Sequence, residues 1–317
     1  MRKMANEFRV KFWGVRGSYP VPGPSTIYYG GNTTCVEVRA GGHLIILDAG
    51  TGIIGLGYQL LHQHEATGEP IFATILFSHT HHDHTQGFPF FRPAYLGSST
   101  LYIFGPKMFR EDLKEAIARA MLPPSFPVEL EELNSLKIIR NIEESEVIVF
   151  QPDTPEPMVW NIYRQDHTPG PEQVEIRLYK GYAHPKDGIL IYRISWRGHS
   201  LVFASDTEGY VGDDARLINF TRGADLLIHD AQYTEEEYAH GPRPKQGYGH
   251  STPQMAAQVA RLAGVKQLVL FHHDPHHDDA QIAAIEREVQ RIFPNTIAAR
   301  EGLELTIPLG AEMAGSS

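Results

Sequence analysis

The sequence is poor in cysteine, in long apolar runs and in positive charge. Its 317 residues contain one cysteine, Cys35, which excludes an internal disulfide framework. No apolar run reaches the ~18 residues that span a bilayer, and the first ten residues lack the apolar segment of a secretory signal. We therefore expect a cytoplasmic protein with no membrane segment.

The charge balance restricts the class of partner. A formal net charge of -10 argues against broad, salt-driven binding of nucleic acid, which requires a basic surface. An anionic substrate remains compatible with the sequence, because bound divalent cations reverse the sign of the local potential.

No linker or low-complexity tract divides the chain, and 42% hydrophobic residues can build a large core. We therefore predict a single domain over residues 1–317. A segment at about 106–157, acidic and punctuated by proline towards its end, is expected to form an extension of it.

Short β-branched or aromatic runs predict strands, and apolar residues at helical spacing predict helices. Both halves of the chain place strands first and helices after, which favours two β-rich layers covered by helices. Hairpin turns are expected at AGGH and RGH. The predicted strands lie within 8–14, 34–50, 71–77, 100–106, 146–150, 174–182, 188–206, 224–230, 266–272 and 302–309, and the helices within 50–65, 107–121, 252–265 and 278–293.

A dense histidine motif, HTHHDH, begins one residue after the predicted buried strand 71–77. Side chains alternate along extended chain, so His79 and His81 point the same way and can reach one cation. Asp83 and His84 follow at the turn into a helix, where they can bind a second cation. The spacing predicts a metal site.

Further ligands are expected at other strand ends, where α/β enzymes place their chemistry. Asp206 follows one strand, and its two oxygens can bind both cations. His184 precedes the hairpin that ends at Asp206, and we favour it over His167 as the third ligand of the first cation. Either His272 or His273 can complete the second site; His272 is preferred because it comes directly after its strand.

At this point the chain resembles the metallo-β-lactamase-fold hydrolases, in the branch that contains ribonuclease Z and the metal-dependent cyclic-nucleotide phosphodiesterases. The likeness covers almost the whole chain through FWGVRGSYP, GGNTTCVEV, IILDAG, SHTHHDHTQG, HPKDGILIYRI, ASDTE, IHDAQY, GHSTPQMAAQVA and LFHHDP. It implies an α/β fold, a four-layer αββα sandwich with two mixed β-sheets. It also implies a first metal site of His79, His81 and His184, and a second of Asp83, His84 and His272, with Asp206 shared.

Two further motifs, HDAQ and GHST, stand where the family has a carboxylate and a histidine that act near the leaving group. The resemblance implies that these are Asp230 and His250, which join Asp83 as catalytic residues. The family's glutamate is here an aspartate, one methylene shorter, so the resemblance leaves open whether the two residues are hydrogen-bonded. Asp48 resembles an aspartate that supports the metal-site loops, with an ordinary turn residue as the alternative.

Three other residues are candidates for the substrate side of the site: Arg16, Ser18 and Asn32, with ordinary turn chemistry as the alternative. The proposed ligands offer only nitrogen and oxygen, which suits two divalent ions such as Zn²⁺, Mn²⁺ or Fe. Two such cations would supply a hydroxide nucleophile from water and bind a phosphate oxygen, and His250 would donate a proton to the departing alkoxide.

We therefore expect a phosphodiesterase acting on a small phosphodiester or a cyclic nucleotide. Endonucleolytic processing of RNA 3' ends is not favoured, because the chain lacks an obvious basic, glycine-rich arm. The alternatives are hydrolysis of a lactone, thioester or β-lactam, a di-iron redox protein, and a non-catalytic binding module stabilised by metal. Relatives in this branch are often dimers, which is compatible with a homodimer, but the sequence leaves the oligomeric state open.

Overall fold

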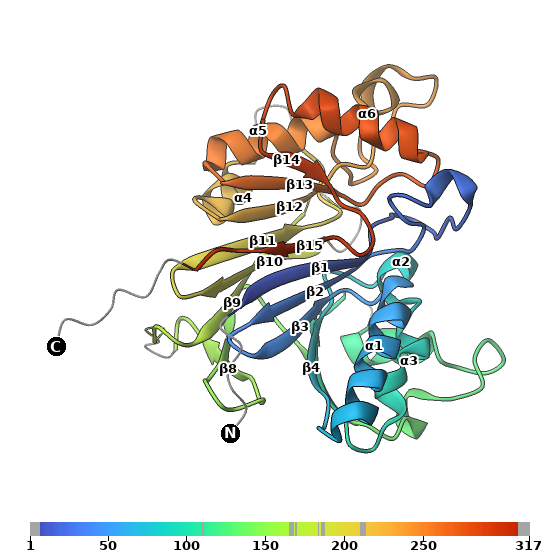
Figure 1. Cartoon of the computed structure of the whole chain (residues 1–317), viewed down its shortest axis with the longest axis vertical. Coiled ribbons are helices and arrows are strands. Elements are labelled where there is room, and N and C mark those ends of the chain that lie inside the picture. Colours follow the sequence, from blue (N-terminus) through green and yellow to red (C-terminus); the bar gives the residue numbers. More distant parts are fainter. Residues whose placement is uncertain are drawn as a thin grey trace.

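A computed structural model describes the chain over 7–108, 111–164, 168, 170–182, 184, 188–209 and 214–309. The rival ligand His167 lies outside these residues. The described strands form two sheets that face each other. In Figure 1, strands β1 to β4 of the first sheet lie below strands β11 to β14 of the second.

The first sheet has seven strands in the order β15-β1-β2-β3-β4-β5-β6. The pairs from β15 to β3 are antiparallel, and those from β3 to β6 are parallel, so the sheet is mixed. The strands are β1 (Phe8–Gly14), β2 (Cys35–Ala40), β3 (His43–Leu47), β4 (Phe72–Leu76), β5 (Thr100–Gly105), β6 (Leu136–Asn141) and β15 (Glu304–Thr306).

The second sheet has eight strands in the order β14-β13-β12-β11-β10-β9-β7-β8. Here the pairs from β14 to β11 are parallel and the remaining pairs are antiparallel. The strands are β7 (Glu146–Phe150), β8 (Met158–Asn161), β9 (Val174–Gly181), β10 (Ile189–Trp196), β11 (His199–Ala204), β12 (Leu226–Asp230), β13 (Gln267–Phe271) and β14 (Thr296–Ala298).

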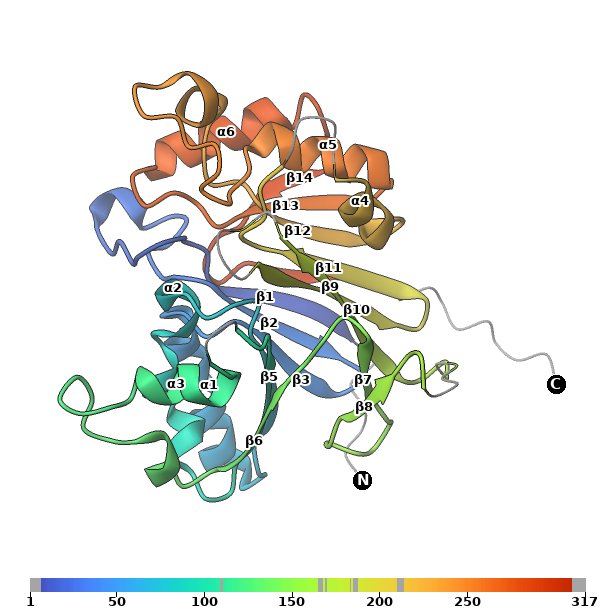
Figure 2. The same ribbon diagram turned by 180° about the vertical axis from the view of Figure 1, so that it is seen from behind.

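Helices cover the outer faces of both sheets, as the front and rear views show (Figures 1 and 2). The α-helices are α1 (Gly52–Thr67), α2 (His82–Thr85), α3 (Leu113–Arg119), α4 (Ala215–Thr221), α5 (Pro253–Ala263) and α6 (Asp279–Val289). Short 3₁₀ segments are η1 (Pro24–Thr26), η2 (Phe88–Phe90), η3 (Arg92–Tyr95) and η4 (Leu130–Glu132), and η5 (Glu236–His240) is a π-helix.

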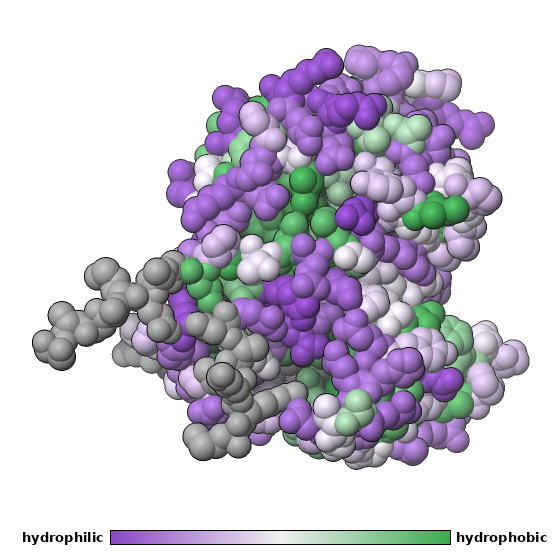
Figure 3. Space-filling model, viewed as in Figure 1, coloured by the Kyte–Doolittle hydropathy of each residue, from purple (hydrophilic) through white to green (hydrophobic). Residues whose placement is uncertain are grey.

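Three hydrophobic layers hold the sandwich together. Alternate residues of β1 and β2, such as Phe12 and Val38, meet β10 and β13 between the sheets. The opposite residues of the first sheet pack on α1 and α3, and those of the second sheet on α4 and α5. The inter-sheet core reaches the surface between β14 and β15 (Figure 3), where Ile297 and Leu305 are partly buried against it. The predicted αββα sandwich with two mixed sheets is confirmed.

The predicted strands and hairpins are present, with differences at element ends. Both hairpin turns adopt left-handed backbone, at Gly41–Gly42 and at Arg197–Gly198. The helix expected over 107–121 begins only at Leu113, because Asp112 caps it and Glu115 completes the capping box. The helix expected over 278–293 ends at Val289.

The segment at about 106–157 supplies strands to both sheets: β6 is the edge strand of the first, and β7 lies next to the edge strand β8 of the second. Among the described helices, none is both long and apolar enough to cross a bilayer.

Candidate metal centre

The predicted ligands come together at the carboxyl ends of the central strands. His79 follows β4, Asp206 follows β11 and His272 follows β13. Asp206 (φ 51°) and His272 (φ 62°) have left-handed backbone, which few non-glycine residues adopt. These turns direct both side chains back over the strand ends, into one buried cluster.

The first group consists of His79, His81 and His184, whose ligating atoms lie within 4.8 Å of one another. His79 and His184 are buried, whereas His81 is exposed. His81 Nδ1 and His184 Nε2 are 3.1 Å apart. This spacing lets both nitrogens face one small cation.

The second group consists of Asp83, His84, Asp206 and His272, all buried and again within 4.8 Å of one another. Oδ2 of Asp206 lies 3.1 Å from His84 Nε2 and 3.3 Å from His272 Nε2. Its other oxygen, Oδ1, lies 3.7 Å from His79 Nε2 in the first group. Asp206 therefore stands between the two groups, as a shared ligand requires.

Hydrogen bonds fix the tautomers of these histidines. His84 Nδ1 donates to Asp48 Oδ2 at 2.8 Å, and His272 Nδ1 donates to Gln232 Oε1 at 2.9 Å. His184 Nδ1 donates to the Gly249 carbonyl at 3.1 Å. In each case the bond at Nδ1 leaves Nε2 facing the cluster, where it can offer its lone pair to a cation, the arrangement typical of metal-binding histidines.

Asp48 organises this support at the end of β3. Its Oδ1 accepts from Ser78 N at 2.7 Å, and its Oδ2 accepts from Ser78 Oγ at 2.8 Å. Because the Ser78 hydroxyl donates to Asp48, it accepts from His79 Nδ1 at 3.1 Å. Asp48 thus contacts the ligands of both groups, directly through His84 and indirectly through His79.

Buried charge makes the cluster attractive to cations. Burial alone lowers the pKa of His84, but Asp206, Asp83 and Asp48 outweigh it and raise that pKa well above its usual value. In the first group, burial and His184 lower the pKa of His81 to about 4. The second group therefore attracts positive charge, while His81 keeps a neutral imidazole.

The donor set fits divalent metal ions. His79 Nε2 is buried and has no hydrogen-bond partner among the described residues, and an unpaired buried nitrogen is costly unless something binds it. The nearby donors are imidazole nitrogens and carboxylate oxygens, which suit zinc, manganese or iron. The cluster is a divalent-metal site.

Asp230 and His250 form a pair beside the ligands. His250 Nδ1 donates to Asp230 Oδ2 at 2.8 Å, so the shorter aspartate does reach the histidine. The His250 ring lies 5.1 Å from the His272 ring and 5.3 Å from the His184 ring, between centroids. Asp206, Asp230, His250 and His272 also form a compact group of potential metal ligands. In that group, however, Asp230 and His250 are already paired with each other.

Burial lowers the pKa of His250, but the Asp230 carboxylate outweighs this and raises it to about 9. At neutral pH His250 therefore carries protons on both ring nitrogens. A protonated imidazole beside a metal site is equipped to donate a proton.

The three candidates for the substrate side have different surroundings. Ser18 N donates to Asp83 Oδ2 at 2.7 Å, so Ser18 lies at the cluster.

Arg16 is buried and donates to three backbone carbonyls, including those of Asp274 and His277. Asn32 donates from its backbone and side chain to Glu301. Arg16 and Asn32 hold neighbouring loops together.

The neighbouring histidines His272 and His273 have different environments. His272 joins the cluster, whereas His273 Nε2 donates to the Ala299 carbonyl at 2.9 Å, away from it.

Gly17 packs against the His272 ring. A Cβ on Gly17 would lie 2.4 Å from His272 Cε1, so only glycine fits there.

Sequence reasoning missed Ser78, Gln232 and Glu208, which contact the ligands or the loops that carry them. Ser78 and Gln232 lie inside the motifs SHTHHD and HDAQ, and Glu208 ends ASDTE. Their position inside these motifs was the available signal. Their partners lie 30–41 residues away along the chain, and only the fold reveals them.

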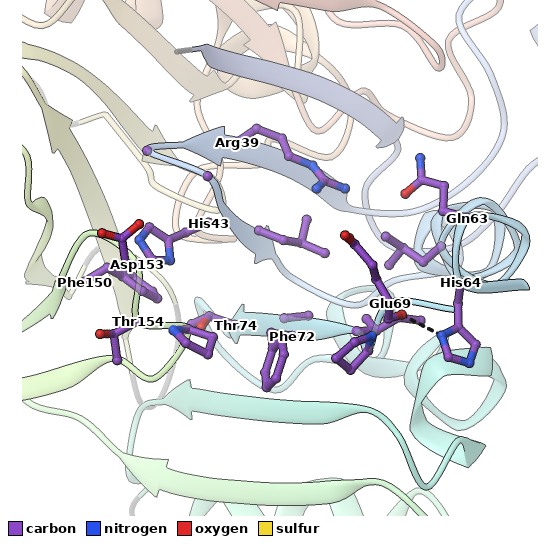
Figure 4. Close-up of a pocket in the computed structure, with 18 of the residues that line it drawn as sticks. Arg39, His43, Gln63, His64, Glu69, Phe72, Thr74, Phe150, Asp153 and Thr154 are labelled. Carbon is purple, nitrogen blue, oxygen red and sulfur yellow. Dashed lines mark hydrogen bonds between the residues drawn. The ribbon is translucent and has the colours of Figure 1, made fainter. Parts of the chain in front are cut away.

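A cleft of about 760 Å³ lies elsewhere (Figure 4). Arg39, His43 and Phe72 line it, with Gln63 from α1 and Asp153 after β7. None of the clustered ligands lines this cleft. His43 and Phe72 begin β3 and β4, so it lies at the end of these strands opposite to the cluster.

Comparison with known proteins agrees with this architecture. The family described as Beta-lactamase superfamily domain matches residues 43–273. Ribonuclease Z of Bacillus subtilis (strain 168) is 26% identical over 258 residues, covering 74% of this chain and 81% of that protein. Ribonuclease Z of Gemmatimonas aurantiaca is 26% identical over 344 residues, covering 96% of this chain and 98% of that protein.

Solved structures share the fold. A metallo-β-lactamase fold protein from Bacillus subtilis superposes with a TM-score of 0.62 at 20% identity, covering 95% of this chain and 99% of that one. The short form of human tRNase Z gives a TM-score of 0.61 at 22% identity, with the same coverage.

Proposed function

The chain belongs to the β-lactamase superfamily and is a metal-dependent hydrolase, and on that premise we propose that it hydrolyses phosphodiesters at a dinuclear metal centre. The observation that carries the proposal is the buried His250–Asp230 pair beside two groups of metal ligands. The reaction class follows from what this pair can do for a leaving group.

His79, His81 and His184 would hold one cation, and Asp83, His84 and His272 the other, with Asp206 shared. When bound, such a pair supplies Lewis acidity towards a phosphate oxygen and a nucleophile from water near neutral pH. The chain's own contribution to the attack is orientation. Asp48 and Gln232 fix the imidazole tautomers so that lone pairs face the reaction site.

His250 would donate a proton to the leaving group. Its Nδ1 proton is held by Asp230 Oδ2, which leaves the Nε2 proton for the departing oxygen. An alkoxide is a poor leaving group, so a positioned acid is worth about 10²–10⁴-fold. A lactone or β-lactam also requires an acid, but the family likeness to ribonuclease Z favours phosphorus over carbon.

Two kinds of substrate fit the site. The net charge of -10 favours small diesters, including cyclic nucleotides. The likeness to ribonuclease Z over 96% of the chain favours RNA 3' ends. Turnover of the manganese- and zinc-loaded protein on cyclic nucleotides, linear dinucleotides, an aryl diester and a precursor RNA distinguishes them. Lactones and thioesters belong in the same panel, and hydrolysis of these alone would contradict the proposal.

His250→Ala tests the role of the acid. We expect it to retain both metal ions and to slow cleavage of alkyl diesters by about 10²–10⁴-fold. Cleavage of bis-p-nitrophenyl phosphate should slow much less, because nitrophenolate departs without a proton. Metal content by mass spectrometry and kcat on both substrates are measured; equal losses on the two substrates would reject a proton-donor role.

A further inference from the structure

The loop that carries His250 is attached to a buried carboxylate outside the ligand set. Glu208 lies two residues after Asp206 and is 7% exposed. Its Oε1 accepts from Gly247 N at 2.7 Å and from the Tyr238 hydroxyl at 2.8 Å, and its Oε2 accepts from Gly249 N at 2.9 Å. One side chain thus binds the loop immediately before His250 at two backbone positions.

The backbone of this loop is shaped for the carboxylate. Gly247 (φ 81°) and Gly249 (φ 89°) both have left-handed backbone, which glycine adopts at little cost. With this backbone, both N–H groups reach the two oxygens of one side chain. A buried carboxylate needs such donors, so neither partner is free to move away.

A second set of bonds joins the same two segments. Ser251 Oγ donates to the Thr207 carbonyl at 2.6 Å and accepts from Gly209 N at 3.0 Å. Ser251 N donates to Asp230 Oδ1 at 2.9 Å. His250 is therefore held on both sides, by Glu208 before it and by Ser251 after it.

We propose that Glu208 is a positioning residue for the proton donor: it fixes the loop at 247–249 so that His250 meets both Asp230 and the leaving group. The inference rests on the proposed function, because it assigns Glu208 a role in the same reaction. Glu208 would act through His250, because both of its oxygens are bound by Tyr238, Gly247 and Gly249. Glu208 also joins the segment that carries Asp206 to the segment that carries His250. The distance between this predicted metal ligand and the proton donor is therefore fixed.

Glu208→Gln tests this role, because it keeps the size of the side chain and replaces one acceptor with a donor that faces a backbone N–H. We expect kcat on alkyl diesters to fall by about 10–100-fold, since small displacements of a catalytic group have effects of that size. The aryl diester should lose less than about threefold, and both metal ions should remain bound. Tyr238→Phe, which removes one of the three donors, should give a smaller change in the same direction.

Hydrogen exchange gives a readout independent of turnover. In Glu208→Gln, the amides of Gly247 and Gly249 should exchange faster, while those of β12 keep their protection. Asp225→Asn is the matched control. Asp225 also accepts a backbone N–H, from Ser200 at 2.8 Å, but it precedes β12 at the end opposite to Asp230. It should leave the ratio of alkyl to aryl turnover unchanged.

The outcomes separate the two proposals. Equal losses on both diesters, loss of metal, or unchanged amide exchange would overturn the role of Glu208 while leaving the phosphodiesterase intact. Absence of turnover on every diester by the metal-loaded wild-type protein would instead remove the proposed function.

Discussion

Asp48→Asn tests most directly whether the hydrogen bonds of Asp48 hold the predicted metal ligands in place. Asp48 is fully buried and accepts three hydrogen bonds, two from Ser78 and one from His84 Nδ1. Its backbone is left-handed (φ 59°), a conformation that asparagine tolerates as well as aspartate. The exchange therefore changes hydrogen bonding while the turn is kept.

The size of the effect follows from the acceptors that are lost. Asparagine presents one oxygen to three donors: in one orientation its amide group faces Ser78 N, and in the other it faces both Ser78 Oγ and His84 Nδ1. In the first orientation a buried N–H loses its partner; in the second, the imidazole loses the bond that fixes its tautomer. Residues that orient metal ligands are typically worth 10–100-fold in metal affinity. This range corresponds to about 1.4–2.7 kcal/mol of binding free energy.

The assay is a competition titration of metal-free protein against a fluorescent chelator, with stoichiometry by mass spectrometry. We expect the weaker binding to fall mainly on the site that contains His84, because His81 and His184 do not contact Asp48. Ser78→Ala keeps the backbone N–H and should weaken binding less. Unchanged affinity at both sites in a folded Asp48→Asn protein would refute the reasoning.

Two further substitutions probe the strand end after β13. His272→Ala should lose one of the two metal ions, while His273→Ala should keep both and lower only the melting temperature, because its ring donates to the Ala299 carbonyl; equal metal content in the two variants would contradict the assignment. Gly17→Ala should reduce metal content, because its Cβ meets the His272 ring at 2.4 Å, whereas Gly23→Ala adds a Cβ where nothing lies within 4 Å. If both glycine variants bind metal like the wild type, His272 is not held by this contact.

Much of the fold was predictable, because its strands are apolar and its turns carry glycine. β6 was missed because its residues alternate between exposed and half-buried at the sheet edge, which removes the apolar signal. β14 is three residues long, too short for a periodic pattern. The capping box of Asp112 and Glu115 could be recognised in the sequence. The apolar spacing before it nevertheless suggested that the helix begins earlier, at residue 107.

The residues of the site were likewise predictable only in part. Four of the predicted metal ligands lie in a dense histidine motif after an apolar strand, and the other three lie beside the ends of other predicted strands, which is why the sequence could identify them. The residues that orient them were harder to find. Glu208 and Gln232 contact partners 30 to 41 residues away, and only the pairing of β11, β12 and β13 brings those segments together. His272 and His273 are equivalent as neighbours in a sequence, and only the backbone turn at His272 separates their roles.

The left-handed backbone at His272 is shared by two other residues of the site that follow strands. Asp48, Asp206 and His272 each leave a strand through left-handed backbone, a conformation that costs free energy for a residue with a Cβ. Asp48 and Asp206 belong to a residue type that tolerates it, whereas histidine at such a position is less common. The strain is maintained because the three side chains are buried and hydrogen-bonded, Asp48 to Ser78, Asp206 to Ser205 and His272 to Gln232. Cations that bind only this native arrangement would stabilise it further by mass action, so metal binding and the strained strand ends support each other.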